Sequence, residues 1–381
     1  MRVGVLQGVR IVEFEGLGPG PFCGMLLADL GADVILIERK GGAPGQNNGA
    51  GSAAIFKRGK RSIALDLKND EAKKIALDII AHSDALIEGL RPGVMERLTL
   101  GPDDVRARNK KLVYGRLTGW GQTGPLSHTA GHDINYAALS GAAWYAGADG
   151  DAPVPPPTLV GDVGGGALYL AIGILAGIMR ARETGEGTVV DAAIVDGSAH
   201  MMNLLYSVRA AGAMPDERGQ SMLDGAHFYS AYECACGGWV SIGPLEPKFY
   251  MELLEKLGLS GDADFAAQYD KSKWPALKGR FVEIFKSKTR DAWTAVFEGT
   301  DVCYAPVLSP SEAAAHPHMK ARKTLREIGG VLQAAAAPRF DGAVPADPGA
   351  IPAPGEHADQ ILSEIGADER TIKALRAAGI L

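Results

Sequence analysis

The sequence is poor in cysteine, in aromatic side chains and in basic charge, and each shortage excludes a class of protein. Its four cysteines, Cys23, Cys234, Cys236 and Cys303, form no C-x-x-C pair, which excludes a disulfide framework and a cysteine metal cage and favours a reducing, cytoplasmic location. A net charge of −6 argues against general binding of nucleic acid. The apolar run at 163–179 is marginal for a bilayer. Its glycines favour a buried core helix without a membrane span.

What is present is a globular composition and a regular alternation of elements. The chain has 381 residues, 46% of them hydrophobic, which is enough for about two domains. Strand and helix patterns alternate through the first third, which predicts an α/β fold with a mostly parallel sheet and helices on its faces. The predicted strands are 9–14, 32–38, 61–67, 84–90 and 112–120, and the predicted helices are 22–31, 69–83 and 92–100. A different unit, opening with a hairpin that turns at Gly237–Gly238, extends from about 226 to 310.

The first strand, loop and helix have the outline of a dinucleotide site. The loop reads GLGPGP, and Glu38 closes the second predicted strand. A dinucleotide fingerprint needs a third glycine where this chain has Pro21, and Pro19 stiffens the same turn. Proline also removes a backbone N–H that a pyrophosphate would need. The pattern therefore disfavours a nicotinamide enzyme and favours an ordinary strand-to-helix turn.

Basic residues gather in the segment FKRGKRS and at the ends of neighbouring predicted elements. Guanidinium groups bind phosphates in a bidentate manner and lysine adds a point charge, so such a cluster is suited to a ligand with several phosphates. A solvated charged surface has the same pattern, and the spacing leaves both interpretations open. The candidate residues are Arg39, Lys57, Arg58, Lys60, Arg61, Arg91 and Arg97.

Two polar residues stand beside glycine, each before a predicted helix. His132 precedes one helix in GHDINY, and Asp162 precedes the apolar run in GDVGGG. An imidazole and a carboxyl group on opposite faces of a carbon acid would form a proton-transfer pair, and a helix start would stabilise the enolate oxygen. Other interpretations stay open: Asp162 as a helix N-cap, His132 as a core histidine, and Asp133 as the cap beside it.

Ordered motifs along nearly the whole chain resemble the α-methylacyl-CoA racemases, within the family III CoA-transferase group. They include GLGPGPFCGMLLADLGADVILIER, FKRGKRSIALDLK, EGLRPGVMERLTLGP, GRLTGWGQTGP, GHDINYAALSG, GDVGGGALYLAIGILA, SIGPLEPKFY, HPHMKAR and GEHADQILSEIG. The set is specific for the group, and GHDINY with GDVGGG points to the racemase branch.

The resemblance implies a domain arrangement and an assembly. A large Rossmann-like domain would combine residues 1–192 and 337–381, and a smaller α+β domain would span 226–313. Linkers would occupy 193–225 and 314–336. Two subunits would form an interlocked homodimer, with each active site between the large domain of one subunit and the small domain of the other.

The resemblance also implies residue roles. His132 and Asp162 would be the acid/base pair, Glu246 would hydrogen-bond the histidine, and Tyr229 would lie in the site. Asp133 would offer its backbone N–H to the thioester oxygen. The seven basic residues named above match the positions that hold the phosphates and adenine of CoA.

The implied activity is interconversion of (2R)- and (2S)-2-methylacyl-CoA by 1,1-proton transfer, in branched-chain fatty acid or sterol side-chain metabolism. No cofactor or metal is expected, because CoA is part of the substrate. The alternative is a CoA transferase with Asp162 as nucleophile. Gly18 stands where formyl-CoA-type transferases have glutamine, and SIGPLEP lacks their run of four glycines. A non-catalytic acyl-CoA-binding protein is a third interpretation.

Overall fold

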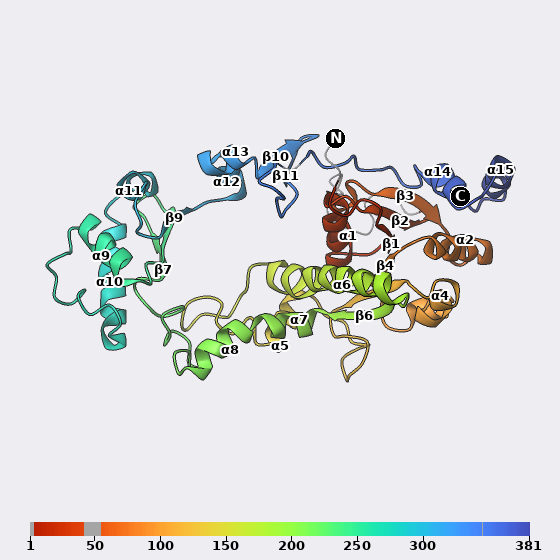
Figure 1. The fold of residues 1–381 in the computed structure, drawn as a ribbon. Helices are drawn as coiled ribbons and strands as arrows, with labels where there is room; N and C mark the ends of the chain where they lie inside the picture. Colours follow the sequence, from red (N-terminus) through yellow and green to blue (C-terminus); the bar gives the residue numbers. More distant parts are fainter. Residues whose placement is uncertain (1–3, 42–54, 345) are drawn as a thin grey trace. The chain divides into compact units, whose positions relative to one another are not determined.

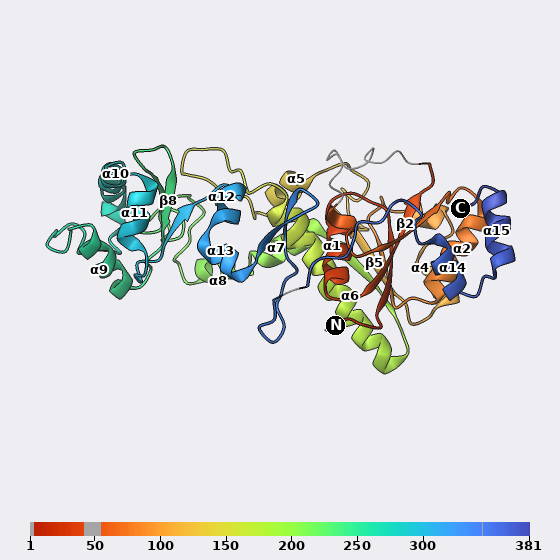
Figure 2. The ribbon, with the colours of Figure 1, turned by 90° about the horizontal axis from the view of Figure 1, so that it is seen from above.

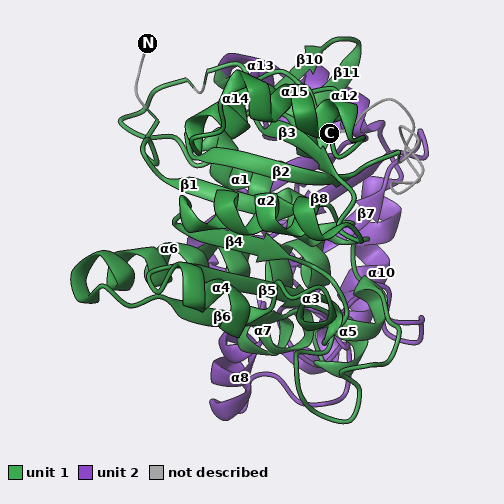
Figure 3. Ribbon diagram, turned by 90° about the vertical axis from the view of Figure 1, so that its right-hand side faces the viewer, with its two compact units in different colours: residues 1–142, 155–201, 322–381 green, residues 143–154, 202–321 purple. Residues whose placement is uncertain are grey.

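The computed structural model describes residues 4–41, 55–344 and 346–381, which form two compact units (Figure 3). The first unit contains residues 1–142, 155–201 and 322–381, and the second contains 143–154 and 202–321. Both ends of the chain thus belong to one unit. The boundaries differ from the expected ones: 143–154, expected in the large domain, belongs to the second unit, and the expected linker 193–225 is divided, with 193–201 in the first unit and 202–225 in the second.

A six-stranded parallel sheet forms the centre of the first unit. Its order is β3-β2-β1-β4-β5-β6, the order of doubly wound nucleotide-binding sheets. Ile11 of β1 pairs with Val34 of β2 on one side and with Ala85 of β4 on the other. The predicted α/β fold with a parallel sheet is confirmed. The strands are β1 (Arg10–Phe14), β2 (Asp33–Arg39), β3 (Arg61–Leu65), β4 (Ala85–Glu88), β5 (Val113–Thr118) and β6 (Thr188–Ala193).

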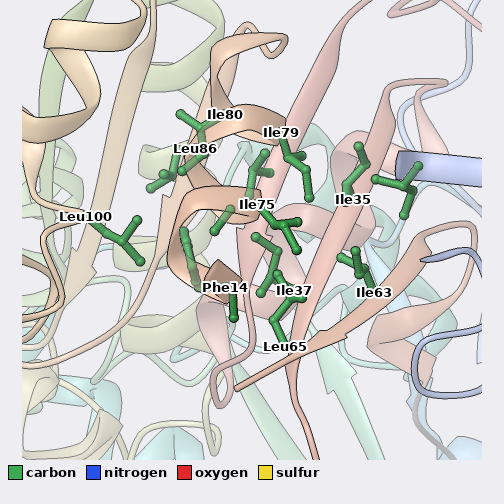
Figure 4. Packing of buried hydrophobic residues seen from close by; sticks show 14 of the residues in the cluster. Phe14, Ile35, Ile37, Ile63, Leu65, Ile75, Ile79, Ile80, Leu86 and Leu100 are labelled. Carbon is green, nitrogen blue, oxygen red and sulfur yellow. The ribbon is translucent and has the colours of Figure 1, made fainter. Parts of the chain in front are cut away.

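Alternate side chains of the strands enter two separate cores, because successive residues of a strand point to opposite faces. On one face, Phe14, Ile37 and Leu65 pack with residues of α2 (Asp70–Ala81), α4 (Pro102–Arg108), α14 (Ala358–Glu364) and α15 (Glu369–Ala377) (Figure 4). On the other face, Ile11 and Val34 pack with α1 (Pro19–Asp29) and α6 (Leu168–Thr184). The C-terminal helices α14 and α15 therefore share a core with the first strands (Figure 1, Figure 2).

Helix α1 begins with the prolines that break the dinucleotide fingerprint. Pro19 is its first residue, and Pro21 lies in the same turn. Proline is tolerated there because the first N–H groups of a helix have no intrahelical acceptor. Gly18 precedes the helix with φ = 62°, a left-handed conformation that glycine adopts without strain. The other short elements of this unit are η1 (Ile55–Lys57), α3 (Val94–Arg97), β10 (Leu325–Ile328) and β11 (Val331–Ala334).

The apolar run forms one continuous helix with two different faces. Residues Leu159–Ala167 are a π-helix, and α6 continues it to Thr184. Leu170 and Ile174 are fully buried in the core between α6 and the sheet, but Ile172 is 62% exposed and Met179 73% exposed. By length and composition this helix could cross a membrane. The prediction of a buried core helix is correct for one face and wrong for the other.

The second unit combines a small antiparallel sheet with helices. Strands β7 (Ser230–Glu233), β8 (Trp239–Ile242) and β9 (Tyr304–Val307) pair in that order, and the β7–β8 hairpin turns through the predicted Gly237–Gly238. Its core is rich in aromatic rings, including Phe228, Phe265 and Phe281. The helices are α8 (Asn203–Ala210), α9 (Pro247–Lys256), η3 (Lys271–Lys273), α10 (Trp274–Phe285), α11 (Arg290–Phe297) and α12 (Pro310–Ala315), with α13 (Pro317–Arg322) at the boundary.

Candidate active site

The candidate site lies at the carboxyl end of the parallel sheet, at the point where the connections that follow two adjacent strands lead to opposite edges of the sheet. β1 and β4 are adjacent, but the chain continues from β1 to β2 and from β4 to β5. In open α/β sheets, ligands bind in the crevice beyond such a switch point. A Cβ placed on Gly18, in the loop after β1, would lie 3.6 Å from Oδ2 of Asp162. Asp162 therefore lies beside this loop, at the switch point.

His132 is the N-cap residue of α5 (Asp133–Leu139). Its backbone N–H donates to the side-chain oxygen of Asn135 (3.0 Å), and its carbonyl accepts the N–H of Asn135 (2.8 Å). These bonds fix the backbone, while the residue itself is exposed. The predicted position of His132 at a helix start is confirmed. The two alternatives, a core histidine and Asp133 as the cap, are wrong.

Asp162 lies inside the π-helix, whose N-cap is Thr158, so the N-cap interpretation of Asp162 is wrong. In a π-helix each N–H bonds five residues back, as Val163 does to the carbonyl of Thr158 (3.0 Å). The N–H of Asp162 cannot form such a bond, because the carbonyl five residues before it lies outside the helix. Its N–H donates instead to the carboxylate of Asp133 (2.8 Å). π-helical segments are frequent at functional sites.

The three glycines after Asp162 face helix α7 (Ile194–Met201), and their role is packing. A Cβ on Gly164 would lie 3.1 Å from the side chain of Met201, and one on Gly165 would lie 2.4 Å from that of Ser198. A Cβ on Gly166 would lie 2.9 Å from the side chain of Ile194. Only glycine lets the two helices approach this closely. The glycine run thus fixes the π-helix against α7.

The surroundings of the Asp162 carboxyl group raise its pKa toward neutral pH. Burial and, after it, the negative charge of Asp133 raise the pKa of Asp162, His132 lowers it, and the resulting pKa is about 6. The hydrogen bond from the backbone N–H of Asp162 to the carboxylate of Asp133, the residue directly after His132, joins the two segments that carry the imidazole and the carboxyl group. A general acid or base is most effective when its pKa lies near the working pH. The structure therefore brings the two predicted acid/base residues together in one unit.

Aromatic side chains that sequence reasoning missed pack beneath the start of α5. The Tyr136 hydroxyl donates to the carbonyl of Gly131, and the Tyr136 ring meets Trp120 edge to face, with centroids 4.7 Å apart. A Cβ on Gly131 would come within 2.9 Å of the Trp120 ring. The sequence carried no signal for this aromatic packing, but it had one for the helix start above it, because Asn135 stands three residues after His132, the spacing of a helix cap.

Glu246 and Tyr229 both belong to the second unit. Glu246 is the N-cap residue of α9 and makes no side-chain capping bond, so its exposed carboxylate is available to a partner. It also raises the pKa of the Cys303 thiol, after the larger effect of burial. Tyr229, 40% exposed, packs on Gly243, where a Cβ would lie 3.4 Å from its ring.

The structure corrects the phosphate prediction for Lys60 and Arg58. The Lys60 side chain is fully buried, and its ammonium group lies 2.5 Å from the carboxylate of Glu13. Arg58 is 4% exposed and pairs with Asp29 at 2.5 Å, while also donating to Gln333 of β11 (2.8 Å). A side chain whose charge is buried and paired with a carboxylate in this way cannot bind a phosphate at the protein surface. Both side chains stabilise the fold instead.

The other five basic residues are at least partly accessible. Lys57 pairs with Glu38, and Arg61 binds Asp33 and Glu364, with both side chains partly exposed. Arg39 lines a cavity of about 240 Å³ beside Ala64 of β3 and Gly355. Arg91 and Arg97 are exposed after β4 and in α3. Within the described ranges 4–41, 55–344 and 346–381, no three His, Cys, Asp or Glu side chains are placed to hold a metal ion.

Comparison with known proteins identifies the family of this chain. Residues 6–358 match the model of CoA-transferase family III. The α-methylacyl-CoA racemase of Mus musculus is 40% identical over 98% of this chain and 96% of its own length, and that of Homo sapiens is 38% identical over 99% and 97%. A CAIB/BAIF family protein from Brucella suis has a solved structure with a TM-score of 0.81 and 25% identity, covering 96% of this chain and 100% of its own. The resemblance in the motifs is confirmed: this chain belongs to CoA-transferase family III.

Proposed function

We propose that this protein is an isomerase that interconverts the (2R) and (2S) epimers of 2-methylacyl-CoA thioesters by 1,1-proton transfer. The observation that carries the proposal is the carboxyl group of Asp162, with a pKa raised to about 6 beside His132, at the switch point of the sheet. The relatives that are 38–40% identical are α-methylacyl-CoA racemases, which supports the same substrate class. The reaction requires no cofactor, because the thioester itself acidifies the α-carbon.

The proton transfer uses both side chains in turn. One of the pair, as carboxylate or neutral imidazole, takes the α-proton, and the electrons of the C–H bond delocalise onto the thioester oxygen. The other, in its protonated form, then returns a proton to the opposite face of the same carbon. Asp133 is the first residue of α5, so its backbone N–H has no intrahelical acceptor and can stabilise the enolate oxygen together with the helix dipole.

The remaining roles follow from chemistry and from the family. Arg39, Arg91 and Arg97 are exposed cations that suit the phosphates of CoA, with Lys57 and Arg61 as partly exposed neighbours. The exposed carboxylate of Glu246 suits orientation of an imidazole, because a carboxylate acceptor fixes which ring nitrogen carries the proton.

We propose further that two copies of the chain form the interlocked homodimer of the family. The exposed apolar face of α6, which includes Leu168, Ile172 and Met179, supports a protein partner for this helix. We expect the wild type to sediment as a dimer in analytical ultracentrifugation. Ile172→Glu should weaken the association of the two subunits, and the control Glu183→Gln, on the same helix, should not. A monomeric wild type would overturn this proposal.

A cytoplasmic location remains a proposal as well. Cys23, Cys234, Cys236 and Cys303 are all free thiols, which suits a reducing compartment. Fractionation of cells that express the full chain tests it, and recovery with a sealed organelle would contradict it.

One experiment separates the racemase from its competitors. The protein is incubated with a single epimer of a 2-methylacyl-CoA in D₂O, without any second carboxylic acid. We expect epimerisation with deuterium entering at the α-carbon, and its loss in His132→Ala and Asp162→Ala while CoA binding persists. CoA passing to an added carboxylic acid without α-exchange would indicate a family III transferase with Asp162 as nucleophile. Binding without either reaction would indicate a non-catalytic acyl-CoA-binding protein.

A further inference from the structure

The side chain of Asp133 bridges the two helices that carry the acid/base pair. It belongs to the first residue of α5, directly after His132, and Asp133 is only 8% exposed. Its Oδ1 accepts the backbone N–H of Asp162 (2.8 Å), and its Oδ2 accepts that of Thr158 (3.2 Å). Both N–H groups belong to the start of the π-helix, where no intrahelical acceptor is available.

The backbone beneath this carboxylate leaves no room for movement. A Cβ on Gly161 would lie 2.5 Å from Oδ1 of Asp133, so the carboxylate packs directly on the chain one residue before Asp162. Thr158 is held with φ = 59°, a left-handed conformation that is rare for a threonine. The bond from its N–H to Asp133 compensates for that strained position.

We propose that the side chain of Asp133 is a positioning residue for the proton transfer. It ties the backbone of Asp162 to the residue that follows His132, so the two reacting groups keep one mutual geometry. This inference rests on the racemase proposal and extends it, because the family resemblance assigns to Asp133 only its backbone N–H.

The same carboxylate has a second, electrostatic effect on its neighbour. A buried negative charge disfavours ionisation of a nearby carboxyl group, and the charge of Asp133 contributes to the raised pKa of Asp162, after burial itself. Position and charge can be separated by substitution. Asparagine keeps an oxygen that accepts one N–H but removes the charge, whereas alanine removes both.

The test compares Asp133→Asn, Asp133→Ala and the matched control Asp70→Asn by α-deuteration and epimerisation kinetics across pH. Asp70 is likewise the first residue of its helix, but its side chain is 97% exposed. We expect kcat of Asp133→Ala to fall roughly 10- to 100-fold, as for other residues that orient reacting groups, with little change in KM. Asp133→Asn should retain more activity.

The pH profile distinguishes positioning from a merely structural role. In the direction in which Asp162 accepts the proton, the acidic limb of kcat should move to lower pH by roughly one unit in Asp133→Asn, because a like charge has been removed. Asp70→Asn should match the wild type. If Asp133→Ala fails to fold, the limb in Asp133→Asn decides the question.

The outcomes also separate this inference from the proposed function. The inference would be overturned if the acidic limb of the kcat–pH profile were unchanged in Asp133→Asn and folded Asp133→Ala had the kcat of the wild type. The racemase proposal would not be affected by that result. Absence of α-deuteration in the wild type would overturn the racemase proposal, and the inference with it.

Discussion

Acidification should destabilise the second unit through one histidine, His227. The imidazole is fully buried and surrounded by the rings of Phe228, Tyr250, Phe265 and Phe281, with centroids 5.2–5.8 Å away. Burial lowers the pKa of His227 from 6.5 to about 4. A proton added to this side chain would therefore place a charge inside an aromatic core.

The hydrogen bonds show where that proton would go. The Tyr250 hydroxyl donates to the carbonyl of Phe265 (3.1 Å), so the contact between Nε2 of His227 and Tyr250 (2.7 Å) has the imidazole as donor. Nδ1 is then unprotonated, and among the residues that the structure describes it has no hydrogen-bond partner. Protonation of His227 must occur at this unpartnered nitrogen.

The magnitude follows from the two pKa values. Because the folded-state pKa is depressed, the unfolded chain binds more protons below pH 6.5, and stability is lost as pH falls toward 4. Each pKa unit is worth about 1.4 kcal/mol, so the full difference corresponds to about 3 kcal/mol, of which about 2 kcal/mol is lost between pH 7 and pH 5. That loss is a large fraction of the stability of an ordinary domain.

Urea unfolding followed by tryptophan fluorescence at pH 7 and pH 5 measures this loss. Four of the five tryptophans lie in the second unit, so the signal reports mainly on its unfolding. His227→Gln keeps a donor toward Tyr250 but does not titrate, and it should lose about 2 kcal/mol less than the wild type over this range. The exposed His318→Gln, in the same unit, is the control and should lose as much as the wild type. Equal losses in His227→Gln and the wild type would refute the reasoning.

Three further predictions concern the first unit. Lys60→Met leaves the buried Glu13 carboxylate without its partner and should lower the free energy of unfolding by about 3–5 kcal/mol in urea titration. The double variant Lys60→Met/Glu13→Gln removes both charges and should lower it less. Gly165→Ala should cost about 1–3 kcal/mol in thermal unfolding and reduce kcat, because the new Cβ would lie 2.4 Å from Ser198 Oγ. In the direction in which Asp162 takes the proton, kcat should fall below about pH 6, and a flat profile down to pH 4 would contradict the raised pKa.

Local patterns were sufficient for most of the first unit. Strands β1 to β5 form where the strand patterns that alternate with helix patterns along the chain predicted them. These patterns are apolar because both faces of the sheet are covered, so each strand needs apolar side chains on both sides. The prolines of the first βα turn, which disfavour a dinucleotide site, both lie in the first turn of α1, where a proline is tolerated. The same patterns failed for α3, where nine helical positions were expected and only Val94–Arg97 form the helix.

The basic segment shows what composition cannot decide. Lys57, Arg58, Lys60 and Arg61 are alike in the sequence, yet Lys60 and Arg58 are buried and the other two are partly exposed. Their carboxylate partners are distant along the chain, as Glu13 is from Lys60. Nothing local in the sequence distinguishes a buried ion pair from a phosphate ligand, because the difference lies in which partner the fold brings near.

The sequence alone was sufficient for the class of sheet and the family, and it supplied the hypothesis that His132 and Asp162 carry the proposed chemistry. Only the tertiary structure showed that Asp162 lies within a π-helix, that the glycines beside it serve packing against α7, and that Asp133 ties Asp162 to the helix of His132. The physical reason is the range of the interactions involved. Periodicity and turn chemistry act over a few residues, whereas the pKa of Asp162 and the bridge to Asp133 depend on contacts between segments about thirty residues apart.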